Sequence, residues 1–483
     1  MTTRQPQMSR EFVNVLFDWY ADYDYRGSNR FIYNCLRINS HFFEEGIKRL
    51  WHYIGYCGEA RAEDLASIAK QSIERAQIYA NEVHWLECRD FCGGNVPDGH
   101  NVEILSRLNY PKNTVVYLHT RTVIEVDETA LIAFLQPSVE NFTMNGAFVG
   151  TFDTFLDVLH DRCPDLKELG LHCEKVNFKK LEGYLERSPQ LQTLQIHTTS
   201  AGWSLDTFKL ASQLQELRTL DCPNIEAQWM NSVFNGFPSL CSLHATMSVD
   251  AVEKFHAIAP TLRYLTLNHL KNTTSSSRLF KAASLYQKLV WFEVNLDALE
   301  GSQHDGINGE DLVLLAERCP KLACLRVVGQ ESHPVIHGIT DEVMKRFAQR
   351  CCKLEDFFWL VDDTSSPSFD VLRSLGKHCR KIECIRISVN ASWDSLRLEP
   401  GPKVLFKNLI QLWLAFRGDE QKVSAWAEDS MNIKRLAGFL GPNTPSLHPV
   451  VLIAGSGLEN NLEEAMTKEL REQMTAVTGR DYW

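Results

Sequence analysis

The residues with the most evident chemistry in this sequence are its 14 cysteines and 16 histidines, which in other proteins bind metals or act in catalysis. A structural zinc site usually contains two pairs of closely spaced ligands, such as two C-x₂-C segments. The nearest spacing here is the C-x₃-C of Cys88 and Cys92, and no second pair accompanies it. The cysteines therefore do not predict a metal site, and buried free thiols are the expected alternative.

Short enzyme motifs are equally scarce. Gly455, Ser456 and Gly457 follow a strand-like segment, as in a dinucleotide-binding loop, but Asn460 stands where such a loop has its third glycine. The sequence contains no G-x-x-x-x-G-K-[ST], no H-E-x-x-H and no G-x-S-x-G. We therefore expect a protein that is not an enzyme and that binds neither a cofactor nor a metal, with a convergent active site as an alternative.

Charge and hydropathy narrow the classes of partner. The 483 residues include 50 basic and 61 acidic side chains, and the net charge of −11 argues against binding to nucleic-acid backbones or anionic membranes. The N-terminal stretch MTTRQPQMSREF lacks the apolar core of a signal peptide, and no apolar stretch reaches the roughly 18 residues of a membrane span. We expect a cytoplasmic or nuclear protein with free thiols.

Most of the remaining informative residues lie in a repeated unit, L-x-x-L-x-L or a close variant, which is typical of a short strand. The clearest copies are CPDLKELGL, SPQLQTLQI, APTLRYLTL, CPKLACLRV, CRKIECIRI and FKNLIQLWL. Weaker copies complete thirteen units that recur about every 27 residues, within the range of leucine-rich repeats. The units begin at Val83, Asn113, Val139, Leu166, Leu191, Leu217, Leu240, Leu262, Leu289, Leu322, Leu354, Ile382 and Leu409.

The segments between these strands have the apolar spacing of helices, as in EDLVLLAERCPKL and DEVMKRFAQRCCKL. Thr340, followed by Asp341 and Glu342, is typical of a helix start. A single strand–helix unit cannot bury its apolar faces, whereas stacked units can. The sequence therefore predicts an α/β fold, a leucine-rich-repeat solenoid with parallel strands on the concave face and helices on the convex face.

Four cysteines occupy one fixed place in the repeat, three positions before the first apolar residue of a unit: Cys163, Cys319, Cys351 and Cys379. Other units have Ser188, Phe237 or Ala259 there, so the position accepts compact or apolar groups. We therefore interpret it as a packing position at the end of each helix.

The repeat does not extend over the whole chain. Residues 65–80 have the pattern of one helix, and after the repeats a helix at 433–443, a strand at 448–455 and an amphipathic helix at 459–477 are expected. The predicted organisation is a helical segment over 1–60, a connecting helix over 61–82, the solenoid over 83–425 and a C-terminal cap over 426–483.

Side chains alternate along a strand, so positions 3, 5 and 7 of each unit face away from the core. Aromatic residues and arginine at such positions are typical of protein-binding hot spots. The candidate residues for binding a protein substrate are His197, His244, Tyr264, Trp291, Glu293, Arg326, Phe358, Arg386 and Trp413. His119, His172, His197 and His244 could also form a pH-dependent patch. The alternative is that these outward residues are only a solvated polar face.

Two segments resemble a known family. The cysteine-containing repeats, such as GITDEVMKRFAQRCCKLEDFFWL, are similar to those of F-box proteins, and RFIYNCLRINSHFFEEGIKRLWHYI (30–54) resembles the second half of a divergent fungal F-box. The positions that match are Tyr33, Cys35, Leu36, Ile38, Asn39, Phe42, Phe43, Gly46, Leu50, Trp51 and Ile54. The resemblance departs from the family at its start, because no Leu-Pro pair precedes Phe12.

The resemblance implies a substrate-recognition subunit of an SCF-type cullin-RING ubiquitin ligase. Its N-terminal helices would bind a Skp-family adaptor, which connects to the cullin scaffold, and its concave face would bind a protein substrate. The residues implied in adaptor binding are Phe12, Leu16, Leu36, Ile38, Phe42, Phe43, Leu50 and Trp51. The alternative is a leucine-rich-repeat scaffold with a degenerate F-box and no ligase role, which the missing Leu-Pro pair favours.

Overall fold

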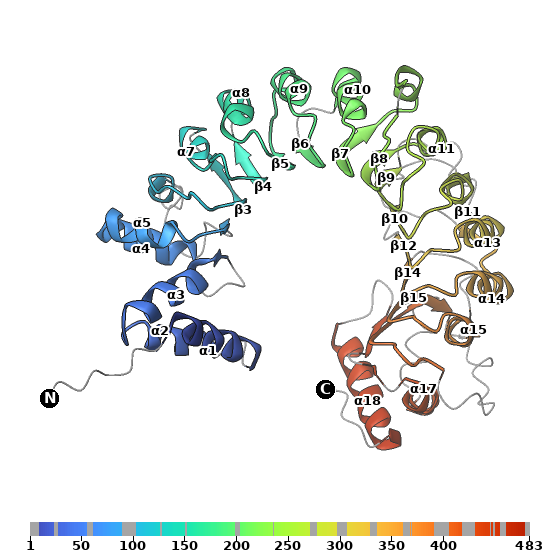
Figure 1. Ribbon diagram of the computed structural model, residues 1–483. Coiled ribbons are helices and arrows are strands. Elements are labelled where there is room, and N and C mark those ends of the chain that lie inside the picture. Colours follow the sequence, from blue (N-terminus) through green and yellow to red (C-terminus); the bar gives the residue numbers. More distant parts are fainter. Residues whose placement is uncertain are drawn as a thin grey trace. The chain divides into compact units, whose positions relative to one another are not determined.

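Two compact units, Met1–Pro223 and Asn224–Trp483, make up the computed structural model of the chain. In each, short parallel strands alternate with helices along the chain (Figure 1). Each unit is an α/β leucine-rich-repeat solenoid, which confirms the predicted fold class. The residues that the structure describes are 9–23, 28–55, 61–88, 103–125, 128–149, 152–198, 203–234, 236–270, 278–296, 307–328, 336–360, 368, 370–390, 405–417, 430–444, 446–447, 450–454 and 460–478.

The strands of the N-terminal unit follow one another in chain order within a parallel sheet. They are β1 (Tyr53–Ile54), β2 (Trp85–Cys88), β3 (Val115–Glu125), β4 (Asn141–Val149), β5 (Glu168–Cys173), β6 (Thr193–Thr198) and β7 (Thr219–Ile225). β1 lies in the segment expected to be helical throughout, and it pairs with β2 through Tyr53 and Trp85. The sheet thus begins before the first predicted repeat.

The C-terminal unit continues the same pattern in its own parallel strands. They are β8 (Ser242–Met247), β9 (Tyr264–Leu270), β10 (Trp291–Asn295), β12 (Cys324–Val328), β14 (Asp356–Leu360), β15 (Cys384–Asn390), β16 (Gln411–Arg417) and β17 (Val450–Ala454). A separate two-stranded parallel sheet is formed by β11 (Ile307–Asn308) and β13 (Ile336–His337), which lie just before helices α13 and α14. Each of the thirteen predicted repeats contains a strand, which starts two residues after the first residue predicted for that repeat.

Helices complete the repeats. The N-terminal unit contains α1 (Arg10–Tyr23), α2 (Ser28–Cys35), α3 (Ser40–Trp51), α4 (Ala62–Gln71), α5 (Ile73–Ala80), α7 (Glu128–Ala133), α8 (Asp153–Arg162), α9 (Phe178–Arg187) and α10 (Leu205–Gln213). The C-terminal unit contains the 3₁₀ helix η1 (Trp229–Ser232), α11 (Val249–Phe255), α12 (Leu279–Ala283), α13 (Gly309–Arg318), α14 (Asp341–Arg350), α15 (Asp370–His378), α17 (Ser430–Asn443) and α18 (Asn460–Thr478). Among the described residues, no helix combines the length and the apolar character that crossing a membrane requires.

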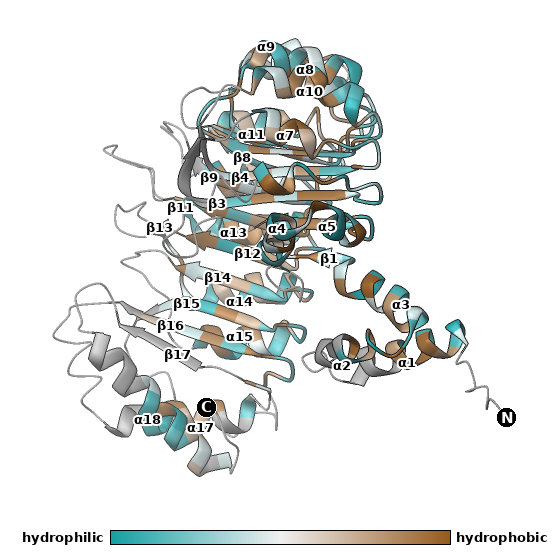
Figure 2. Cartoon of the chain, turned by 90° about the vertical axis from the view of Figure 1, so that its left-hand side faces the viewer, coloured by the Kyte–Doolittle hydropathy of each residue, from teal (hydrophilic) through white to brown (hydrophobic). Residues whose placement is uncertain are grey.

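Alternation along each strand separates a buried side from a strand face, which we define as the side formed by positions 3, 5 and 7. In β6, Leu194 and Ile196 are fully buried, whereas Thr193, Gln195 and His197 remain partly exposed. Apolar residues, brown in Figure 2, run along the strands, and polar residues cover much of helices such as α9. The core therefore lies between the strands and the helices of each unit, as the repeat pattern requires.

Side-chain caps fix where several helices begin. Thr340, predicted as a cap, accepts a hydrogen bond from the backbone N–H of Val343 at 3.3 Å. Ser72 does the same for Arg75, and its extended backbone (φ −156°) separates α4 from α5. The single helix predicted over 65–80 is therefore wrong, because the Ser72 side chain starts a second helix there. The predicted C-terminal helices and strand correspond to α17, β17 and α18.

The four cysteines of the repeat position are buried at the ends of helices α8, α13, α14 and α15, which confirms the packing interpretation. The thiols of Cys163, Cys319 and Cys379 also contact the preceding repeat; for example, Cys319 Sγ lies 3.4 Å from the carbonyl oxygen of Tyr286, and Cys379 Sγ lies 3.3 Å from that of Cys351. A thiol is small enough for this space and is a weak donor. The cysteines thus connect neighbouring repeats, and they form no disulfides among the described residues.

Thiol labelling is expected to separate these cysteines from Cys352, which is exposed. Burial raises the pKa of Cys163, Cys319 and Cys379 to about 12, so only about one molecule in 10⁴ carries the thiolate near pH 8. Brief alkylation of the native chain followed by peptide mass spectrometry should label Cys352 and leave the three buried sites unlabelled. Adding denaturant should make all four react, and equal labelling in the native chain would contradict the packing role.

Candidate functional site

The strand face of the C-terminal unit has a continuous series of aromatic and charged side chains. The residues at position 5 of five successive repeats lie directly beside one another on neighbouring strands. We call this series the arginine–aromatic row, and it consists of Glu293, Arg326, Phe358, Arg386 and Trp413. Because the repeats stack in register, residues about 27 to 33 positions apart in the sequence become lateral neighbours.

Arg326 is held in place by its neighbours on the two adjacent strands, β10 and β14. Its guanidinium lies 4.5 Å from the centre of the Trp291 ring, and its Nε donates a hydrogen bond of 3.0 Å to Asp356. On the side of β10, Glu293 Oε2 lies 3.9 Å from Arg326 Nη1. Burial alone would lower the pKa of Arg326, but the hydrogen bond and charge of Asp356 outweigh it and raise the pKa. The charge of Arg326 is therefore compensated within the protein.

Arg386 has a different environment. Its guanidinium lies between two rings, 5.2 Å from the centre of Phe358 and 4.3 Å from that of Trp413. Its polar neighbour is Gln411, whose Oε1 accepts a hydrogen bond of 3.5 Å from Nη2. Within the part of the chain that the structure describes, no carboxylate forms an ion pair with Arg386. The stacked rings orient the cation without neutralising it, which leaves it able to bind an acidic group.

Two further aromatic residues extend the row toward β9. Tyr264 is 44% exposed, and its register partner Trp291 is half-buried. The indole N–H of Trp291 donates a hydrogen bond of 3.1 Å to Glu293, so this ring is oriented by both the carboxylate and Arg326. The predicted residues Tyr264, Trp291, Glu293, Arg326, Phe358, Arg386 and Trp413 therefore come together on one surface.

Neither predicted histidine belongs to the row, although His244 occupies position 5 on β8 and is separated from Glu293 only by Thr266 of β9. His244, on β8, is hydrogen-bonded to Asn268, and His197, on β6, belongs to the N-terminal unit. Asp356 was not among the residues predicted to bind a substrate, although it accepts a hydrogen bond from Arg326. The sequence does place it at an outward position, but its partnership with Arg326 crosses strands diagonally and has no local spacing signal.

The N-terminal helices α1, α2 and α3 form a small head around Phe17. This ring is fully buried and contacts Phe42 edge-on, with centroids 5.8 Å apart. Gly46 allows α2 and the residue after it to approach α3 closely, since a Cβ atom there would lie 3.2 Å from Ile32 Cγ2 and 2.4 Å from Leu36 Cδ2. Trp51 stacks on Tyr79 of α5 at 4.8 Å and thereby attaches the head to the repeats.

The residues implied in adaptor binding divide by exposure. Phe12, Ile38 and Phe43 are exposed, at 50%, 59% and 38%, and Leu16 and Leu36 are partly exposed. Phe42, Leu50 and Trp51 are buried, so they support the head rather than contact a partner. Val15, at 65%, is a further exposed apolar residue on α1 that the prediction did not include.

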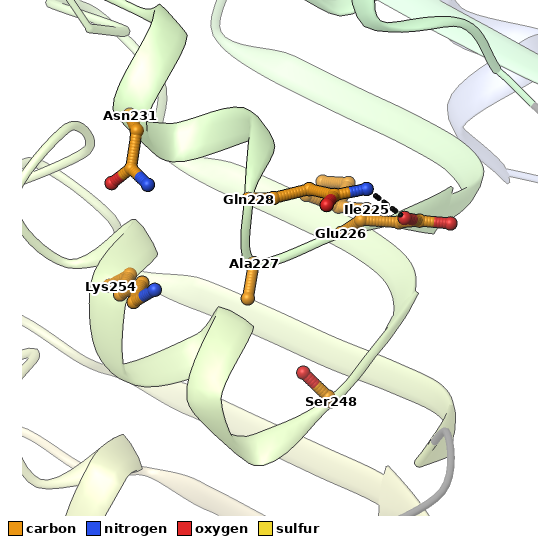
Figure 3. Close-up of a pocket in the computed structure, with 7 residues that line it drawn as sticks. All are labelled: Ile225, Glu226, Ala227, Gln228, Asn231, Ser248 and Lys254. Carbon is orange, nitrogen blue, oxygen red and sulfur yellow. Dashed lines mark hydrogen bonds between the residues drawn. The ribbon is translucent and has the colours of Figure 1, made fainter.

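A pocket of about 430 Å³ lies at the start of the C-terminal unit (Figure 3). Part of its polar lining is already engaged, since Gln228 donates a hydrogen bond of 2.9 Å to Glu226 and Ser248 caps α11 through Ala251. Lys254 contributes a positive charge, but the lining offers no nucleophile paired with a base. Its residues therefore do not form a catalytic arrangement.

Comparisons with known proteins find similarity to solved structures, at low identity and low TM-score. No family model matches it, and no curated protein matches it. A leucine-rich-repeat protein of Leptospira interrogans is 13% identical, with a TM-score of 0.36, over 70% of this chain and 85% of that chain. The leucine-rich-repeat protein LegL7 of Legionella pneumophila is 12% identical, with a TM-score of 0.32, over 74% of this chain and 97% of that chain. Both TM-scores are below 0.5, so the fold assignment rests on the repeat geometry of this chain.

Proposed function

We propose that the chain is a non-enzymatic receptor that binds a protein partner through the strand face of its C-terminal unit. The observation that carries this proposal is the arginine–aromatic row, in which Arg386 is oriented by two rings and has no carboxylate partner among the described residues. Aromatic residues and arginine dominate binding energy in protein interfaces. The partner segment would present an acidic side chain to Arg386 and apolar groups to Trp291 and Tyr264.

The more specific proposal is that the receptor delivers its partner to a cullin-RING ubiquitin ligase. The F-box resemblance of residues 30–54 supports it, together with the exposed apolar residues Phe12, Val15, Ile38 and Phe43 on the head. These residues would contact the Skp-family adaptor, and the chain would supply proximity and orientation rather than chemistry.

A scaffold without a ligase role is the second candidate. The absence of a Leu-Pro pair before α1 favours it. The burial of Phe42, Leu50 and Trp51 also favours it, because three of the residues implied in adaptor binding serve the head's own core. The two candidates differ in one property, which is whether the head binds the adaptor.

Co-purification with a Skp-family adaptor tests the ligase proposal. The wild-type chain should retain the adaptor, and Ile38→Asp should reduce retention at least about tenfold, since it places a charge in the apolar contact. Ile78→Asp is the matched control, because Ile78 is similarly exposed on α5 outside the head, and it should retain the adaptor fully. A wild-type chain that binds no adaptor would leave the scaffold function, and equal retention by both variants would place the adaptor contact elsewhere.

A further inference from the structure

Three side chains that can bind a metal lie together on the strand face of the N-terminal unit. They are His172 on β5, His197 on β6 and Asp221 on β7. The two histidines are register partners, and their ring centroids are 4.4 Å apart. His197 Nε2 lies 2.6 Å from Asp221 Oδ1, and one ligand atom from each of the three residues lies within 4.8 Å of the other two.

The repeat itself brings these residues together. His172 and His197 both occupy position 7 of their repeats, and Asp221 occupies position 5 of the repeat that follows. The Asp221 side chain is only 12% exposed, whereas that of His197 is 28% exposed. The carboxylate therefore lies deeper than the imidazole, and the group is accessible to solvent from the side of the strand face.

The types of ligand favour a transition metal over other cations. Mg²⁺ and Ca²⁺ prefer sites made entirely of oxygen atoms. Two imidazoles and one carboxylate form a ligand set that Zn²⁺ accepts, with water in a fourth position. In a tetrahedral zinc site neighbouring ligand atoms are about 3.3 Å apart, which lies between the 2.6 Å and 4.8 Å found here.

We propose that His172, His197 and Asp221 bind a divalent transition-metal ion, of which Zn²⁺ fits the ligands best. When the ion binds, the neutral His197 ring carries its hydrogen on Nδ1, so that Nε2 can coordinate the metal in place of its contact with Asp221. The ion would then connect three successive repeats. This proposal is independent of the receptor function, since it concerns the other unit of the chain.

Isothermal titration of the full-length chain with Zn²⁺, after treatment with a chelator, tests the proposal. The wild type should bind one ion, and His197→Ala or Asp221→Ala should weaken this binding at least about tenfold. Co²⁺ should give the visible absorption of a four-coordinate site in the wild type and lose it in both variants. Zn²⁺ should also raise the thermal midpoint of the wild type but not that of His197→Ala or Asp221→Ala.

His119→Ala is the matched control, because His119 occupies the same repeat position on β3 and lies outside the cluster. It should bind Zn²⁺ as the wild type does. Circular dichroism of each variant without metal checks that the chain has folded. Zn²⁺ affinity that is unchanged in both cluster variants, or a folded wild type that binds no Zn²⁺, would overturn the proposal and leave His197 and Asp221 as a structural pair.

Discussion

Replacing Trp359 by alanine is expected to lower the free energy of unfolding by about 3 to 5 kcal/mol, the range for removing a large buried aromatic side chain. Trp359 is 1% exposed on β14. It stacks on Phe357 with centroids 6.2 Å apart and on Phe280 of α12 with centroids 5.9 Å apart. The deletion would therefore leave a cavity where helix and strand side chains of different repeats meet, and rigid neighbouring repeats can fill it only in part.

Denaturant unfolding followed by far-ultraviolet circular dichroism measures this loss. Tyr264→Ala is the matched control, because Tyr264 is a 44% exposed aromatic residue on a strand of the same unit; it should cost less than about 1 kcal/mol. If Trp359→Ala unfolds at the same denaturant concentration as Tyr264→Ala, the aromatic cluster is not a main source of stability in this unit.

Replacing Arg386 by glutamate is expected to weaken binding of the protein partner at least about 30-fold, which corresponds to about 2 kcal/mol. The substitution removes the cation between Phe358 and Trp413 and places a negative charge where the proposed partner has its own carboxylate. Arg386→Lys should give an intermediate loss, since lysine keeps the charge but cannot stack on two rings as a planar guanidinium does.

The measurement begins with proteins that the tagged wild-type chain enriches from cell extract, followed by titration of a purified partner. Arg350→Glu is the control, because Arg350 is 62% exposed at the end of α14 and the same charge reversal occurs outside the strand face. It should bind the partner with wild-type affinity. Equal affinities for Arg386→Glu and the wild type would exclude the arginine–aromatic row as the binding surface.

The repeat pattern predicted some local features of the structure and missed others. The periodic pattern located the strand of every predicted repeat, because a leucine or its equivalent must return to the core in each unit. The same pattern identified Cys319 and Cys379 as packing residues. It did not reveal the break at Ser72, since that residue's side-chain hydrogen bond competes locally with a continuous helix. It also missed β1, which is only two residues long.

The sequence by itself determined the fold class, the strand positions and which residues point outward, since each of these follows from period and alternation along the chain. Only the tertiary structure decided which outward residues meet. His172, His197 and Asp221 are 25 and 24 positions apart, so no local motif links them, yet stacking places them on adjacent strands. Arg326 and Arg386 occupy the same repeat position, but only the cross-strand neighbours of each determine that Asp356 pairs with the first. The physical reason is that the repeat period determines which strands lie side by side. Packing between those strands then determines which of their side chains form pairs.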